Sequence, residues 1–376
     1  MQDKMGLKIA VEGRHATWLE LFYDLIYVIV IAKLTHMMGH THDGHMDWHY
    51  YLQSVALFVP VWWCWTGHTM FANRFDADDT MHRLLTLSQM FGALMMAVFI
   101  ENALGEGAVG FILSYVGIRL LLIVMYLRVH VASKDLRHIT RLFSIGFSLG
   151  VACWIASLFV DGPLRYALWA VGLFIDFATP WVGQKRLAKV SVHKEHLPER
   201  LGLLTIIILG ESVLGIVIGV DEVPWGGMTL SNMVLGFVLL CTIWWLYFET
   251  LEHVLAGKIL RSGQLSIYGH LPIYLGLVTL SAGLLHQITG NISLYESMML
   301  LTGGLALILV PLHIIQLAQS HAEIRKKLML GISVLYSALA CILFFHHLMP
   351  SYAPLLLLTC STTAFLVWEH KGKHVW

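Results

Sequence analysis

The chain has 376 residues, of which 57% are apolar and only 13% are charged, whereas a soluble domain carries about 25% charged residues. With a mean hydropathy of +0.70, this composition indicates a polytopic membrane protein whose main partner is the lipid bilayer. The length suffices for about a dozen spans of roughly 20 residues. The net charge is zero, so no nucleic-acid partner is expected.

Apolar windows taken in chain order predict an all-α fold with twelve transmembrane helices. The predicted spans cover residues 17–37, 51–73, 84–103, 108–130, 142–160, 163–183, 201–220, 228–253, 270–289, 296–318, 328–347 and 352–369.

Basic residues concentrate on one side of this topology. Of the 24 Lys and Arg residues, 21 fall at the two ends of the chain or at alternate junctions between spans, and Arg165 is alone at the other junctions. Lys33 and Arg119 lie inside spans. Because cytoplasmic loops carry the excess of Lys and Arg, both termini are predicted to be cytoplasmic.

The two halves of the predicted topology resemble each other. Glu199–Thr205 opens the seventh span much as Glu20–Ile26 opens the first, and the second and eighth spans both contain adjacent tryptophans. We predict two parallel six-helix repeats, residues 1–183 and 201–376, joined by a cytoplasmic linker, residues 184–200. The alternative is that aromatic-rich apolar runs resemble one another by composition alone.

Three motifs resemble those of a known family. They are Trp18–Leu25 after Arg14, His196-x-x-Glu199-Arg200, and the segment Leu209-Gly210-Glu211-Ser212. The chain is similar over nearly its whole length to the bacterial low-temperature-requirement A (LtrA) family. This resemblance implies an integral protein of the bacterial inner membrane that is linked to stress or low-temperature tolerance. It implies no particular activity and no particular cofactor.

Acidic side chains gather near the predicted cytoplasmic ends of several spans. Glu20 and Asp24 lie one turn apart on one face of the first span, and Glu199 has the equivalent place before the seventh. Four further groups are predicted at a similar depth: His68, Glu249, Glu252 and His253. Ionisable groups that face lipid are costly, so the set predicts an acidic vestibule for a cation or protons. Alternatively, Glu20 and Glu199 cap helix starts, where negative charge suits the helix dipole.

Three charges are predicted deeper in the membrane: Arg119 in the fourth span, Asp176 in the sixth and Glu211 in the seventh. A pair between Arg119 and either acid would neutralise both charges and would be structural. The alternative places all three on the transport pathway, with Glu211 binding a proton or cation beside the hydroxyl of Ser212.

The first outer loop is rich in histidine. Imidazole and carboxylate groups there could hold zinc or copper, although a flexible loop fixes no ligand geometry. The alternative is a polar loop of biased composition. The candidate ligands are His36, His40, His42, His45 and His49.

The leading hypothesis is an inner-membrane transport protein that moves a small cation or couples solute movement to protons. An enzyme is not expected, because the sequence has no phosphate-binding loop, dinucleotide fingerprint or His-Glu-x-x-His motif. The alternatives are a metal- or haem-binding membrane enzyme or sensor, and a structural membrane component without transport. The cofactor, the substrate and any homo-oligomer are left open.

Overall fold

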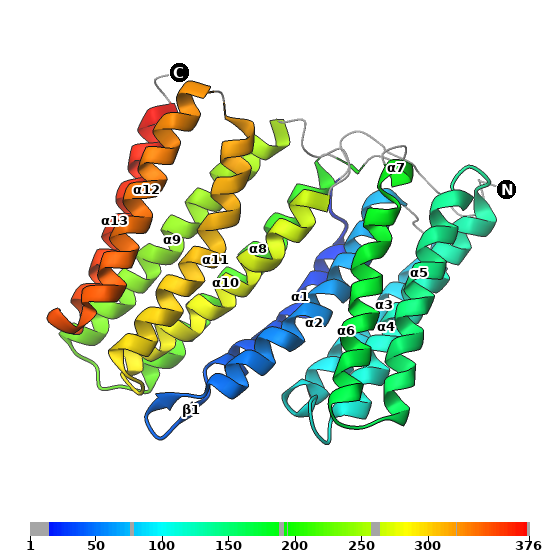
Figure 1. Cartoon of the computed structure of the whole chain (residues 1–376), viewed down its shortest axis with the longest axis horizontal. Coiled ribbons are helices and arrows are strands. Elements are labelled where there is room, and N and C mark those ends of the chain that lie inside the picture. The colour runs from blue at the N-terminus through cyan, green and yellow to red at the C-terminus, as the bar shows by residue number, and fades with distance from the viewer. Residues whose placement is uncertain are drawn as a thin grey trace. The chain divides into compact units, whose positions relative to one another are not determined.

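The computed structural model describes residues 15–75, 79–187, 192–193, 195–256, 264–320 and 322–373. These residues form twelve long helices (Figure 1), one for each predicted span, which confirms the all-helical prediction. The long helices are α1 (Trp18–Met38), α2 (Trp48–Arg74), α3 (Thr80–Phe99), α4 (Ala108–Ala132), α5 (Arg137–Ala156), α6 (Pro163–Val182), α8 (His196–Asp221), α9 (Gly227–Ala256), α10 (Gln264–Thr289), α11 (Leu294–Gln319), α12 (Ala322–Phe345) and α13 (Ala353–Lys373). The remaining elements are the short helix α7 (Gln184–Leu187), three 3-10 segments and the hairpin of β1 (Thr41–His42) and β2 (His45–Met46).

Nine of the long helices in the described part of the chain are long and apolar enough to cross a membrane. Nine of the twelve predicted spans are therefore supported as membrane crossings. The other three are α2, α6 and α13, whose apolar residues are mixed with tryptophans and polar groups. The predicted six-helix repeats remain a prediction.

Helix starts follow local capping chemistry. Asp79 precedes α3 and its side chain accepts a hydrogen bond from the backbone N–H of His82, as expected for an N-cap. Before α11, Ser293 and Glu296 form a reciprocal capping box. These caps satisfy backbone donors that have no partner inside the helix.

The chain divides into two compact units. Unit 1 comprises Met1–Lys33, Ala56–Leu203 and Lys258–Ile267, and unit 2 comprises Leu34–Val55, Leu204–Gly257 and Tyr268–Trp376.

In unit 1, α4 packs against α3 and α5, and α5 packs against α6. Stacked aromatic rings fill this part of the core: Trp154 lies 4.0 Å from Tyr115 and 4.8 Å from Trp169 between ring centroids. In unit 2, α9 packs against α11 and α13, and α12 packs against the same two helices. Helices α10 and α11 approach closely at two glycines, because a Cβ added to Gly276 would lie 2.7 Å from the carbonyl oxygen of Gly304.

Candidate functional site

The start of α1 carries the first acidic group of the site. Oε2 of Glu20 accepts hydrogen bonds from the backbone N of Thr17 at 2.8 Å and from its hydroxyl at 3.0 Å. In return, the hydroxyl of Thr17 accepts from the backbone N of Glu20 at 3.3 Å. This is the reciprocal capping box of a Thr-x-x-Glu sequence. Glu20 therefore caps its own helix, as expected under the capping alternative and not only under that of an acidic vestibule.

Glu20 also belongs to a buried group of four side chains, which we call the charge cluster: Glu20, Asp24, His196 and Arg200. Oε1 of Glu20 lies 3.2 Å from Nε2 of His196 and 3.3 Å from Nη1 of Arg200. Oδ1 of Asp24 lies 2.5 Å from Nη2 of Arg200. Three of the four side chains are 0% exposed and Glu20 is 3% exposed. The cluster thus joins the first turns of α1 and α8 inside unit 1.

Helix geometry explains why these residues meet. Glu20 and Asp24 are four residues apart on α1, and His196 and Arg200 are four apart on α8. Residues at this spacing lie one above the other on one helix face. The face of α1 carries two carboxylates, and that of α8 carries an imidazole and a guanidinium. The side chains of one face can therefore pair with those of the other. Trp65 of α2 adds a further contact, because its indole N–H donates to Oδ1 of Asp24 at 2.7 Å.

The hydrogen bonds around His196 assign a role to each of its ring nitrogens. The backbone N of His193 donates to Oδ1 of Asn73 at 2.9 Å, which identifies the other side-chain atom of Asn73 as the amide nitrogen. That nitrogen lies 3.1 Å from Nδ1 of His196, which must then accept. The ring proton is left on Nε2, which faces Glu20 at 3.2 Å.

Within the cluster, the carboxylates of Glu20 and Asp24 face the guanidinium of Arg200. The two oxygens of Asp24 are satisfied unequally. Oδ1 of Asp24 receives both Arg200 and Trp65, whereas Oδ2 is buried and has no hydrogen-bond partner among the described residues. A buried acceptor without a partner is rare and costly. Oδ2 of Asp24 is therefore an unsatisfied acceptor inside the cluster.

Polar aromatic side chains surround the acidic face of α1. The hydroxyl of Tyr23 lies 3.2 Å from that of Tyr27 and 3.4 Å from Oε1 of Gln89. The ring of His68 stacks on Tyr23 with centroids 4.0 Å apart, and His82 follows at 6.3 Å from His68. His68, predicted at a similar depth to Asp24, is thus placed beside α1.

A second buried ion pair lies between α4 and α6. Nη2 of Arg119 is 2.8 Å from Oδ2 of Asp176, and both side chains are almost fully buried. The hydroxyl of Tyr115 donates to the same oxygen at 2.9 Å, and the guanidinium lies over the ring of Phe147 at 4.1 Å. Of the two partners considered for Arg119, the structure selects Asp176. This pair neutralises both charges, as the structural alternative requires.

With this geometry established, comparison with known proteins identifies the family. The model of the family described as bacterial low temperature requirement A protein (LtrA) matches residues 15–367. The chain belongs to the LtrA family. The uncharacterized protein RA0937 of Rhizobium meliloti (strain 1021) is 28% identical to it over 296 residues, which cover 71% of this chain and 68% of that protein. The charge cluster includes members of two of the motifs that carry the resemblance.

Other predicted residues of this LtrA protein lie in unit 2. The hydroxyl of Ser212 donates within α8 to the carbonyl of Ile208 at 3.2 Å. Glu211 is half-buried and forms no ion pair with the described residues. Oε1 of Glu249 lies 3.2 Å from Nδ1 of His370. The side chains of two predicted residues, Glu252 and His253, lie outside the described residues.

Glu199, one residue before Arg200, does not join the cluster. Its Oε2 accepts from the backbone N of Ala16 at 3.0 Å and lies 3.6 Å from Nδ1 of His15. Glu199 therefore holds the segment that leads into α1.

The histidine-rich loop of this LtrA protein forms the β1–β2 hairpin. Asp43 and Gly44 both have positive φ, 52° and 78°, which is typical of a two-residue hairpin turn. The hairpin pairs His42 with His45, and Nδ1 of His45 lies 3.4 Å from Glu296. Nowhere in the described part of the chain do three His, Cys, Asp or Glu side chains come together to hold a metal. The predicted ligands His36, His40, His42, His45 and His49 are thus not assembled into a site.

Three residues of the site were not predicted as site residues from the sequence: His196, Arg200 and Trp65. The first two carried a signal, because their spacing of four matches that of Glu20 and Asp24. Trp65 carried none, because the contact between α1 and α2 cannot be read from either sequence.

Proposed function

We propose that this LtrA protein is an inner-membrane transporter coupled to protons, and that the charge cluster is its proton-binding site. The observation that carries the proposal is the buried Oδ2 of Asp24, which has no hydrogen-bond partner among the described residues. Binding one proton there would remove the negative charge of Asp24. Burial of a charge is unfavourable, so the protonated carboxyl suits this buried position.

The chemistry around Asp24 favours a proton over a metal cation. A hard cation needs several oxygen ligands, but the groups that contact Asp24 are N–H donors from Trp65 and Arg200. A proton needs one free lone pair, and Oδ2 supplies it. The cluster therefore suits proton binding, with any transported solute held elsewhere.

Protonation would also change how α1 and α8 are held together. A neutral Asp24 attracts Arg200 less, so the guanidinium would depend on Glu20, whose Oε1 is 3.3 Å from Nη1. The contact between the two helix starts would then have two alternative states. Coupled transport requires such a two-state element whose equilibrium is shifted by the proton.

A structural component without transport is the second candidate. The observation in its favour is that Glu20 caps α1 and also bonds to α8, so the cluster would hold two helices together even if it never exchanged a proton. The two candidates differ in whether the cluster titrates in the folded protein.

The first test is a pH titration followed by infrared spectroscopy on the purified full-length protein in liposomes. We expect a protonated-carboxyl band that appears on acidification and is lost in Asp24→Asn, which removes the negative charge at position 24 without a proton. Glu101→Gln is the matched control, because its exposed pair with Lys33 at 2.8 Å contributes only about 0–1 kcal/mol. A wild-type spectrum without a titrating carboxyl assigned to Asp24 would favour the structural component.

The second test measures flux with a pH-sensitive dye inside the same liposomes. Wild type and Glu101→Gln should move protons at similar rates, and Asp24→Asn should be at least about tenfold slower at equal incorporation, equivalent to about 1.4 kcal/mol. Wild-type liposomes that pass no protons, alkali cations or divalent metals would contradict the transport proposal.

A further inference from the structure

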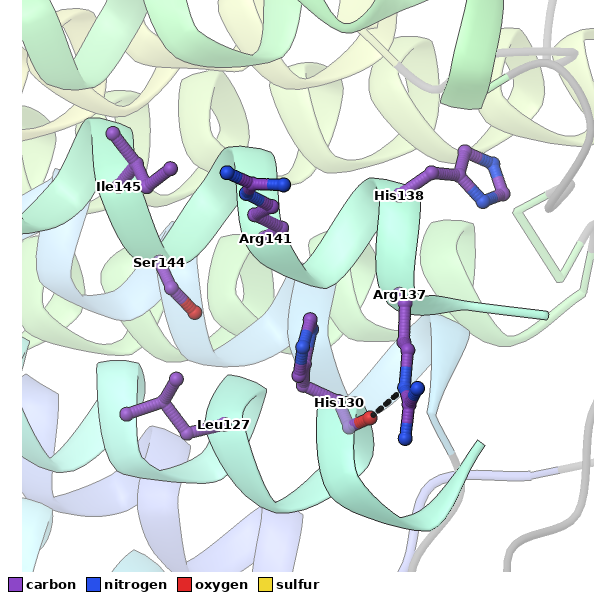
Figure 2. A pocket seen from close by; sticks show the side chains of 7 residues that line it. All are labelled: Leu127, His130, Arg137, His138, Arg141, Ser144 and Ile145. Atoms are coloured by element: carbon purple, nitrogen blue, oxygen red, sulfur yellow. Dashed lines mark hydrogen bonds between the residues drawn. The ribbon is translucent and has the colours of Figure 1, made fainter. Parts of the chain in front are cut away.

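A cavity of about 490 Å³ lies between the end of α4 and the start of α5, in unit 1. Figure 2 shows the side chains that line it: Leu127, His130, Arg137, His138, Arg141, Ser144 and Ile145. None of them belongs to the charge cluster or to the Arg119–Asp176 pair.

The mouth of this cavity is basic. Arg137 and Arg141 are one turn apart on α5, and Nε of Arg137 donates to the backbone carbonyl of His130 at 3.2 Å, as drawn in Figure 2. Among the described residues, neither arginine forms an ion pair with a carboxylate. Guanidinium groups bind phosphate readily, because each can donate two parallel hydrogen bonds, and both Arg137 and Arg141 are exposed beside the cavity.

Ser144 supplies an independent sign of a ligand. Its side chain is 7% exposed, yet its hydroxyl has no hydrogen-bond partner among the described residues. Helical serines usually donate to the carbonyl four residues earlier, as Ser114 does to Gly110 at 2.7 Å in α4. The hydroxyl of Ser144 instead points toward α4, into the space between the helices (Figure 2). A buried polar group without a partner in such a cavity indicates a missing hydrogen-bonding ligand.

The depth of the cavity matches the edge of a bilayer. Both α4 and α5 are candidate membrane spans, and the lining residues of α5 extend from its first residue over roughly 12 Å. The polar headgroup layer is about 5–7 Å thick on each side. With the start of α5 at the outer edge of this layer, both arginines lie within it and Ser144, roughly 10 Å along the helix, lies just inside the hydrocarbon. Beyond them, Leu127 and Ile145 are 46% and 51% exposed, which offers an apolar surface for an acyl chain.

We propose that this cavity binds the headgroup of an anionic phospholipid. The phosphate lies between Arg137 and Arg141, a headgroup oxygen accepts from Ser144, and one acyl chain follows Leu127 and Ile145. Basic pockets at the ends of membrane helices bind anionic headgroups in this way.

Native mass spectrometry of the full-length protein in detergent, titrated with phosphatidylglycerol or phosphatidylcholine, tests the proposal. Phosphatidylglycerol should bind as a resolved adduct, and Arg137→Gln with Arg141→Gln should weaken it roughly thirtyfold. Arg325→Gln with Lys326→Gln, an equal charge change at the exposed start of α12, should leave the affinity within about twofold.

Ser144→Ala separates the site from general charge attraction. This variant keeps every charge and removes a hydroxyl that bonds to nothing described, so it should fold as well as wild type. It should nevertheless bind phosphatidylglycerol roughly threefold to tenfold more weakly, the equivalent of one hydrogen bond. Ser148→Ala, one turn along α5 on an exposed position, should have no effect.

Three results would overturn the proposal. One is equal binding of phosphatidylcholine and phosphatidylglycerol. Another is unchanged phosphatidylglycerol binding in both the arginine and Ser144 variants. A third is full competition by inorganic phosphate or glycerol phosphate at the lipid's own concentration, which would assign the cavity to free phosphate.

Discussion

Asp176→Asn tests the buried ion pair that holds α4 to α6. Asparagine has nearly the same shape as aspartate and can still accept from Arg119 and Tyr115, whose distances to Oδ2 are 2.8 and 2.9 Å. What the substitution removes is the negative charge. Arg119 is 0% exposed, so its guanidinium would remain buried without a counter-charge.

The expected cost follows from this burial. Removing one partner of a buried ion pair destabilises a protein by about 3–5 kcal/mol. The retained hydrogen bonds place Asp176→Asn near the lower end, at about 3 kcal/mol. Arg119→Met should cost a similar amount, because it leaves the buried carboxylate of Asp176 without its counter-charge. The double variant has no uncompensated charge and should cost only about 1–3 kcal/mol, mostly from lost packing over the ring of Phe147.

A double-mutant cycle measures this directly. Each variant would be unfolded reversibly by sodium dodecyl sulfate in mixed micelles, and the free energy of unfolding compared with that of wild type. The coupling energy between Arg119 and Asp176 should be at least about 3 kcal/mol. The exposed pair of Lys33 and Glu101, taken through the same cycle, should give about 0–1 kcal/mol. Additive effects at Arg119 and Asp176 would refute the reasoning, because they would mean that the two charges are solvated separately.

Two further predictions concern unit 1. Gly150→Ala should lower the free energy of unfolding by about 1–3 kcal/mol in the same assay, because the added Cβ would lie 2.5 Å from Oδ1 of Asp176; an alanine variant as stable as wild type would contradict this. The second prediction concerns Asp79. Burial raises the pKa of its carboxyl, but the hydrogen bonds from Arg128 at 2.6 Å and from the backbone N–H of His82 lower it more. The pKa of Asp79 therefore lies below its ordinary value. A lowered carboxyl pKa stabilises the fold above the unfolded-state pKa of about 4, and this contribution is lost as the pH falls through the folded-state pKa. Asp79→Asn should therefore destabilise by about 1 kcal/mol at neutral pH, and the difference from wild type should shrink on acidification; a difference independent of pH would contradict the assignment.

Apolar windows predicted the helices well, because membrane spans require long apolar runs. All twelve predicted spans coincide with long helices, from α1 to α13. Helix boundaries were predicted less well where side-chain packing, and not hydropathy, determines them. The start of α8, for example, precedes its predicted span by five residues, because His196 and Arg200 belong to the helix and are buried by partners on α1.

Arg200 shows why the charge cluster was only half predicted. In the topology it counted as a basic residue of the cytoplasmic linker, and Lys and Arg in such positions are usually solvated. A count of charges along the chain cannot separate a solvated arginine from a buried one. The spacing can, because Glu20 with Asp24 and His196 with Arg200 both repeat after four residues and so present matching faces of opposite character. Spacing cannot show that Trp65 contacts one oxygen of Asp24 while the other has no partner in the described part of the chain, since that depends on how α2 packs. The feature that supports proton binding therefore arises from tertiary packing, whereas the charges that make it possible are already present in the sequence.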